Sequence, residues 1–257
     1  MSAVALAPED MDISLLLSEF CSVVATDLRQ FARLHAKELD QQQIHQLQVA
    51  GFPRGLGFKL ESEEAAPVIA HLAEQVSNWP EVLSQSELDE LAADFAAIYL
   101  TCHYGSCPQE SYWMDEDHLT MQKPMFQLRE ILEQQGLEVS DVHQFADDHL
   151  VNELELLAYF LEQKPDLAGL GKIADFMDEH LLRWVMSFSE RVALMCESEF
   201  YAGLALITGL YCEAFRDLLA QVLDQKRPTK REIDARMNPK KVVTVPLQFI
   251  PGIQKSW

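Results

Sequence analysis

Residues 200–212 read Phe-Tyr-Ala-Gly-Leu-Ala-Leu-Ile-Thr-Gly-Leu-Tyr-Cys and form the longest apolar stretch of this 257-residue chain. The stretch falls short of the about 18 apolar residues that suggest a membrane span, so we expect no stable membrane insertion. Small residues within it, such as Gly203 and Gly209, would let neighbouring helices approach closely. Large side chains at helical spacing predict one long buried helix, and these are Phe200, Leu204, Ile207, Tyr211, Phe215, Leu218 and Val222.

Apolar residues recur at the same helical spacing along most of the chain. Further helices are therefore predicted over residues 9–36, 40–50, 63–77, 84–103, 119–135, 146–162 and 167–184. Ser84 and Glu87 have the spacing of a capping box, which marks a helix start. Because few segments alternate with period two, we predict an all-α fold, with a single bundle-like helical domain over residues 1–225.

The charge of the chain restricts its partners. Its 41 acidic and 20 basic residues give a formal net charge of −21. This excess of carboxylates argues against binding nucleic acid, whose phosphates need Lys and Arg, and it favours a basic partner. The composition changes at Lys226, since residues 226–241 hold seven basic and two acidic side chains. We expect residues 226–257 to be a basic tail, extended or mobile.

The first residues and the cysteines indicate the compartment. The N-terminal stretch has no basic region followed by an apolar run, so no signal peptide is expected. The five cysteines lack the spacing of a disulfide framework, which is typical of reduced thiols. A cytoplasmic protein is therefore predicted.

Residues 103–113, His-Tyr-Gly-Ser-Cys-Pro-Gln-Glu-Ser-Tyr-Trp, form the longest irregular segment between two predicted helices. Tyr104, Tyr112 and Trp113 are residue types that anchor binding sites, although Tyr112 and Trp113, each taken alone, are equally consistent with a core position. The acids at 115–117 would suit a cationic segment of a partner. A second polar stretch, Asp147-Asp148-His149-Leu150, opens a later helix and is expected to face this segment.

Two groups of residues have side chains that could bind a metal ion or transfer protons. Cys102, His103 and Cys107, with His149, form a weak metal-ligand pattern because no second ligand pair has the usual spacing, and two small buried thiols are the preferred interpretation. His149 and Glu153 lie one helical turn apart and, with Asp148, could form an acid–base site.

The alternative for the second group is that Asp148 caps the helix and Glu153 is a surface charge. The chain has no nucleophile elbow, no phosphate cradle and no Glu-x-x-His motif. We therefore predict a protein that is not an enzyme and needs no metal or cofactor. Two other hypotheses remain: a metal-dependent enzyme using the Cys102, His103, Cys107 and His149 cluster, and an acidic scaffold for a basic protein.

Three stretches, in order and spacing, resemble a known family. The first is Leu91–Leu100 followed by Pro108-Gln-Glu-Ser-Tyr-Trp113, and the second is Asp148-His149-Leu150 with Glu153-Leu154. The third is His180-Leu-Leu-Arg-Trp184 with Phe188, followed by Phe200-Tyr201 and Leu204-Ala205. Together they are similar to the TorD/DmsD family of redox-enzyme maturation chaperones, relatives of the NarJ-type assembly chaperones.

The resemblance implies an all-helical cytoplasmic chaperone, monomeric or a helix-swapped dimer. Such proteins bind the twin-arginine leader and the apo form of a molybdopterin-dependent catalytic subunit. They assist cofactor insertion and hold back export until maturation. The family's leader-binding surface maps here onto Phe95, Ile98, Tyr99, Pro108, Ser111, Trp113, Asp148 and His149. Apolar contacts would set the affinity, while carboxylates such as Asp148 would pair with the arginines.

Overall fold

The computed structural model describes residues 8–139 and 145–238. These residues form helices and contain no strand, so the all-α prediction is confirmed; Gln109 and His149 make an isolated antiparallel bridge. The chain divides after Arg227 into two units, each described here by itself. No helix of the described part has both the length and the apolar character that crossing a bilayer requires.

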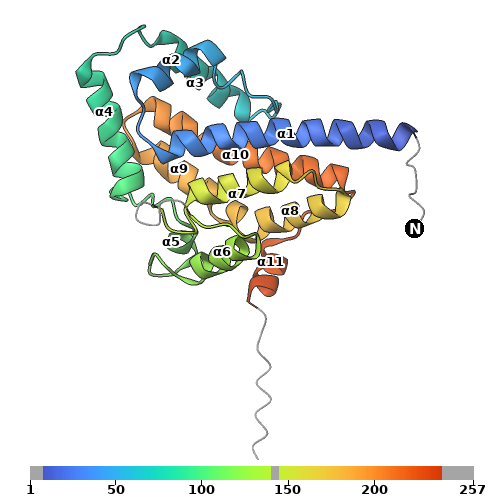
Figure 1. Ribbon diagram of the computed structural model, residues 1–257. Helices are drawn as coiled ribbons and strands as arrows, with labels where there is room; N and C mark the ends of the chain where they lie inside the picture. The colour runs from blue at the N-terminus through green and yellow to red at the C-terminus, as the bar shows by residue number, and fades with distance from the viewer. Residues whose placement is uncertain (1–7, 140–144, 239–257) are drawn as a thin grey trace, which may run out of the picture. The chain divides into compact units, whose positions relative to one another are not determined.

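The first unit contains all the helices up to residue 222 (Figure 1). Its α-helices are α1 (Pro8–Ala36), α2 (Gln41–Ala50), α3 (Ala65–Asn78), α4 (Gln85–Phe95), α5 (Glu110–Met114), α6 (Lys123–Gln134), α7 (Leu150–Glu162), α8 (Leu167–Glu179), α9 (Val185–Met195) and α10 (Glu199–Val222). A π-helix, η1 (Ala96–Leu100), continues α4, and a 3-10 turn, η2 (Leu181–Arg183), lies between α8 and α9.

Helix α10 is the buried helix that the apolar spacing predicted. It packs against α9, α3 and α8, while α1 lies along α7 (Figure 1). A Cβ at Gly203 would lie 3.1 Å from Leu72 of α3, and one at Gly209 would lie 2.5 Å from Met186 of α9. Glycine at these two positions therefore lets α10 approach α3 and α9 closely. The largest fully buried side chains of this unit include Phe31, Phe52, Trp184, Phe188, Tyr201, Tyr211 and Phe215.

Some element boundaries differ from the prediction. The capping box of Ser84 and Glu87 begins α4 as expected, but α4 passes into the π-helix η1 instead of continuing to His103. The long helical region expected to begin with Leu167 to Trp184 is interrupted, because α8 stops at Glu179 and α9 begins at Val185. His180 has a non-helical backbone at this break, with φ −125° and ψ −87°.

The described part of the second unit contains one helix, α11 (Lys230–Met237). An extended or mobile tail was expected here, but Thr229 and Glu232 form a reciprocal capping box that starts a helix. The side-chain oxygen of Thr229 accepts a hydrogen bond from the Glu232 N–H, and the Glu232 carboxylate accepts one from the Thr229 N–H. The rest of the expected tail, residues 239–257, lies outside the described residues.

Candidate functional site

The segment from Cys102 to Met114 begins where the helical hydrogen bonds of α4 widen. At the end of the π-helix, the Thr101 N–H donates to the Ala96 carbonyl at 2.9 Å. Beyond it, the His103 N–H donates to the Ala97 carbonyl at 2.8 Å. Cys102 then has a left-handed backbone, with φ 49°. Short π-helical turns are frequent at functional sites because they redirect the chain inside a helix.

This segment is bonded directly to the start of α7. The Glu110 N–H donates to the Asp148 carbonyl, and the Leu150 N–H donates to the Pro108 carbonyl, both at 2.9 Å. The two polar stretches that the sequence analysis expected to face each other are therefore paired through their backbones.

Asp148 reinforces this pairing with its side chain. Its Oδ2 accepts a hydrogen bond of 2.8 Å from the Ser111 N–H, in the first turn of α5. Burial raises the pKa of Asp148, and the bonds from Ser111 oppose that rise. The interpretation of Asp148 as the cap of α7 is wrong, because its carboxylate holds α5 instead.

His149 is the residue that caps α7. Its Nδ1 accepts a hydrogen bond from the Val151 N–H at 3.2 Å, and its ring lies 4.7 Å from the ring of Phe145. Burial lowers its pKa to about 3, so the imidazole is neutral at physiological pH. This geometry uses the ring as a helix cap rather than as a base for catalysis.

A buried cluster of acids lies behind the segment. Glu110 and Glu153 are both 0% exposed. The Glu110 Oε2 lies 2.8 Å from Nδ1 of His180, and the Trp184 Nε1–H donates to the Glu153 carboxylate at 3.2 Å. The alternative that placed Glu153 on the surface is therefore wrong. Burial raises the pKa of Glu153 well above its ordinary value, and the charges of Glu110 and Asp148 add to this rise.

The eight residues expected to bind a leader differ in exposure. Seven are buried: Phe95, Ile98, Tyr99, Pro108, Ser111, Asp148 and His149. Trp113 is half-buried, and its Nε1–H donates to the Cys107 carbonyl at 2.7 Å. Of the eight, Trp113 alone presents more than a small part of its side chain to a partner.

The buried members form two groups. Pro108, Ser111, Asp148 and His149 meet where the segment pairs with α7. Phe95 and Tyr99 pack in the core with ring centroids 4.7 Å apart. The Tyr99 hydroxyl lies 2.6 Å from Nδ1 of His35, whose Nε2 lies 2.9 Å from the Thr208 hydroxyl.

The outer face of the segment and the chain that follows it are aromatic and apolar. Tyr112 and Met114 are half-buried beside Trp113. Leu119 and Met121, which follow, are 52% and 65% exposed. Glu116 and Asp117 are also exposed, so negative charge accompanies this apolar surface. We define residues 112–121 as the outer face of the site.

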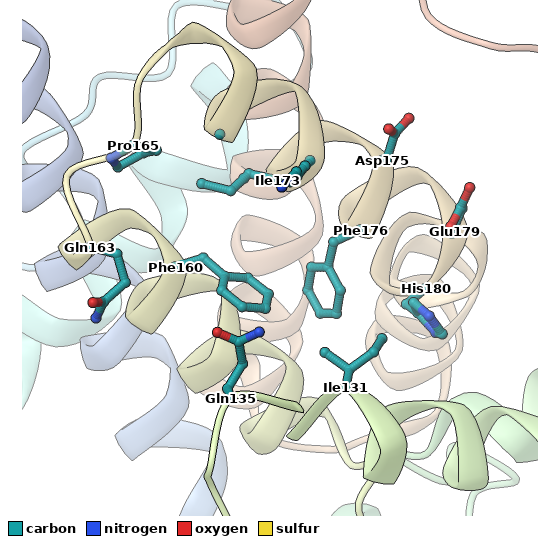
Figure 2. Close-up of a pocket in the computed structure, with 12 residues that line it drawn as sticks. Ile131, Gln135, Phe160, Gln163, Pro165, Ile173, Asp175, Phe176, Glu179 and His180 are labelled. Carbon is teal, nitrogen blue, oxygen red and sulfur yellow. The ribbon is translucent and has the colours of Figure 1, made fainter. Parts of the chain in front are cut away.

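A cleft of about 500 Å³ lies between α6, α7 and α8, and Figure 2 shows its lining. Phe160 and Phe176 meet edge to face in it, with ring centroids 5.5 Å apart, and Ile131 and Ile173 complete its apolar side. His180 lines the cleft and also contacts Glu110, so the cleft and the segment share this residue.

Sequence reasoning missed this cleft. Its residues are spread over three helices between Ile131 and His180, so no local motif reveals them. The one signal was the His180-to-Trp184 stretch, which marked the family resemblance without indicating a cavity.

The metal-ligand pattern is not assembled. The described residues contain no group of three His, Cys, Asp or Glu side chains arranged to hold a metal ion. His149 is used as a helix cap, while His103 is exposed and lies beside Tyr104, with ring centroids 5.7 Å apart.

Comparison with known proteins supports the family resemblance. The family model described as "Nitrate reductase delta subunit" matches residues 61–190. The chain is 31% identical over 204 residues to the chaperone protein TorD of Vibrio cholerae serotype O1 (El Tor Inaba), covering 75% of this chain and 86% of that protein.

Two further relatives carry the same name. The chain is 28% identical over 194 residues to the chaperone protein TorD of Vibrio parahaemolyticus, covering 71% of this chain and 88% of that protein. It is 30% identical over 169 residues to the TorD protein of a Psychrobacter species, covering 63% and 76% respectively. The matched family model and these relatives show that the chain belongs to the TorD family of chaperones and is not an enzyme.

Proposed function

We propose that this protein is a cytoplasmic chaperone for the catalytic subunit of a molybdopterin-dependent oxidoreductase. It binds the twin-arginine leader of the apo subunit, holds back export and assists cofactor insertion. One observation carries the proposal. The 102–114 segment, which contains the family-like loop, is fixed from behind by Asp148 and by the Glu110–His180 contact, and it leaves Trp113 accessible.

The proposal divides the eight expected residues by role. Trp113 contacts the leader together with Tyr112 and the rest of the outer face. Ser111, Asp148 and His149 are positioning residues, because their polar atoms are directed at the protein's own backbone. Phe95, Ile98, Tyr99 and Pro108 support the segment from the core.

The chemistry of a twin-arginine leader suits this surface. The leader has a basic part followed by an apolar stretch. Burying one large apolar side chain contributes about 1.5–3 kcal/mol before ordering costs, whereas an exposed ion pair contributes about 0–1 kcal/mol. We therefore assign most of the affinity to the aromatic side chains. The charge of −21 contributes to the rate of approach of a basic peptide.

Isothermal titration calorimetry with a synthetic leader tests the proposal. The leader peptide should bind saturably, and replacing both arginines by glutamine should weaken binding by about two- to thirtyfold, as two exposed ion pairs of about 0.2–1 kcal/mol each would. The Trp113→Ala variant should bind at least about tenfold more weakly than wild type. Equal affinity for both peptides, or no binding at all, would contradict the function.

Two matched variants separate contact from stability. Trp79 is also half-buried, and its ring packs on Phe200 at 5.1 Å, so Trp79→Ala should lower the melting temperature without changing the affinity. Asp148→Asn keeps an oxygen for the Ser111 N–H, and Asp148→Ala removes it. The Asn variant should therefore bind nearly as wild type and the Ala variant more weakly. If Trp113→Ala lowers only the melting temperature, Trp113 belongs to the core and the assignment is wrong.

A further inference from the structure

A second pocket, of about 350 Å³, lies between α6 and the chain that leads into α7, and we call it the α6 pocket. Met125 and Leu132 line it from α6, and Phe145 lines it from the chain before α7. Met121, the last residue of the outer face, also lines this pocket. The α6 pocket is therefore continuous with the surface to which the leader is assigned.

Two contacts hold the α6 pocket together. Arg129 of α6 forms an ion pair with Asp147, in which Nη2 and Oδ2 lie 2.7 Å apart. The ring of Phe145 lies 4.7 Å from the ring of His149, which caps α7. Both contacts fix the chain before α7 relative to a helix, so the pocket is formed without a bound ligand, as most ligand sites are.

The lining of the α6 pocket is largely apolar and partly accessible. Leu137, Val139 and Phe145 are half-buried, whereas Met125 and Leu132 are only 6% and 8% exposed. The volume of about 350 Å³ falls at the lower end of the roughly 300–1,000 Å³ that is usual for ligand pockets. Two methionines contribute to the lining, and their flexible side chains adapt to apolar groups of different shape. The pocket therefore suits an apolar segment whose exact sequence varies.

Acidic and apolar side chains follow one another towards this pocket. Glu116 and Asp117 are exposed, and Leu119 and Met121 come next in the chain with 52% and 65% of their surface exposed. Exposed carboxylates attract a basic peptide segment, and an apolar segment gains free energy by leaving water for the pocket. A twin-arginine leader has the same order of chemistry, a basic part followed by an apolar stretch.

We propose that the α6 pocket is the subsite for the apolar stretch of the leader, and that the basic part lies over Glu116 and Asp117. The leader then runs in a defined direction, from the acids of the outer face past Met121 and into the pocket. This inference rests on the proposed function, because the leader is the occupant, and it adds where each part of that peptide binds.

Photo-cross-linking to the wild-type protein tests the direction. A synthetic leader carries p-benzoylphenylalanine either in its apolar stretch or beside its arginines, and mass spectrometry maps the cross-linked residues. The probe in the apolar stretch should attach within residues 121–147, and the probe beside the arginines within residues 112–118. The reverse assignment, or attachment of the apolar probe to the cleft between α6, α7 and α8, would overturn the proposal.

The Val139→Asp variant tests the pocket by calorimetry. It places a carboxylate among the apolar side chains at a half-buried position, and it should weaken leader binding about tenfold, as the loss of one buried apolar side chain would. Val139→Leu keeps the position apolar and should bind nearly as wild type. Circular dichroism verifies that each variant is folded, and the cross-linking result does not depend on any variant.

Leu194→Asp is the matched control for the added charge. Leu194 of α9 is 78% exposed and is not among the described residues that line the α6 pocket. This variant should keep the wild-type affinity, because distant exposed charges are screened by salt. Equal affinities for Val139→Asp and Leu194→Asp would contradict the assignment of the pocket.

The outcomes also separate this inference from the proposed function. A leader that fails to bind the wild-type protein would contradict the proposed function itself. A leader that binds the wild type and depends on Trp113, but binds Val139→Asp unchanged, would leave the function in place and overturn only the subsite. Replacing the apolar stretch of the peptide by serines should weaken binding to the wild type and abolish the difference between wild type and Val139→Asp.

Discussion

Glu110, Asp148 and Glu153 are three carboxylic acids without exposed surface in one part of the protein. Each has a distinct partner: His180 for Glu110, the Ser111 backbone for Asp148, and the Trp184 indole for Glu153. Buried acids are tolerated where such hydrogen bonds compensate for lost hydration. These residues fix the site because their bonds connect segments that are distant in the chain.

Glu153 gives the site a pH dependence of defined sign. Its folded-state pKa is raised by burial, so the folded protein keeps the proton while the unfolded chain loses it near pH 4.3. Stability contributed by Glu153 is full below that pH and is lost as the pH rises towards the folded-state pKa, at about 1.4 kcal/mol per pH unit.

The Glu153→Gln variant should remove this loss, since the Gln amide oxygen can still accept the Trp184 N–H. Its melting temperature should exceed that of wild type at pH 7, and the difference should shrink towards pH 4. Thermal unfolding from pH 4 to pH 8 measures this. Parallel curves for the two proteins would show that Glu153 is ionised in the folded state.

The roles of individual residues in the site were harder to predict from the sequence than the helices or the family. Asp148 and His149 were identified as a pair that faces the 103–113 segment, and the backbone bonds confirm this. Their separate roles depend on tertiary partners: the Ser111 N–H lies 37 residues from Asp148 in the chain. A local pattern cannot show whether an aspartate caps its own helix or another one.

Among the helices, α10 was predicted from the sequence because its apolar residues keep helical spacing along its whole length. The π-helix at Ala96–Leu100 was not, because it changes the backbone hydrogen bonds without any change in apolar spacing. The break at His180 was also hidden, since apolar residues continue on both sides of it. By contrast, α11 could have been predicted from Thr229 and Glu232, which have the spacing of a capping box.

Two glycines test how the helices pack. A Cβ at Gly209 would lie 2.5 Å from the Met186 sulfur and 2.9 Å from the Ser189 hydroxyl. That hydroxyl lies 2.8 Å from the Val185 carbonyl oxygen of α9 and 2.6 Å from the Ala205 carbonyl oxygen of α10, and it has a single hydrogen to donate between them. These contacts limit how far it can move. Gly171 in α8 has no atom within 4 Å of such a Cβ.

Gly209→Ala should therefore destabilise the protein by about 1–3 kcal/mol, as overpacking does. Gly171→Ala should stabilise it by up to about 1 kcal/mol, through helix propensity. Urea unfolding of both variants gives the comparison. Stabilisation in both would mean that α9 and α10 can separate without loss.

At the scale of the whole molecule, the ordered motifs between residues 91 and 205 predicted the family, and the matched family model and relatives confirm it. The motifs did not predict which of the side chains assigned to leader binding are exposed to solvent. Seven of the eight residues assigned to the leader are buried, because residues that hold a loop in place and residues that contact a ligand form one motif in the sequence. Only the packed structure separates the two groups.

Hydrogen–deuterium exchange across the entire chain, with and without a saturating twin-arginine leader peptide, measures whether the leader binds at residues 102–121. Protection should concentrate in residues 102–121 and be absent from α2 and α3 (Gln41–Ala50 and Ala65–Asn78), which serve as the internal control. The Trp113→Ala variant should lose this protection at the same peptide concentration. Unchanged exchange in residues 102–121, or protection confined to the cleft between α6, α7 and α8, would contradict the proposal that the leader binds this segment.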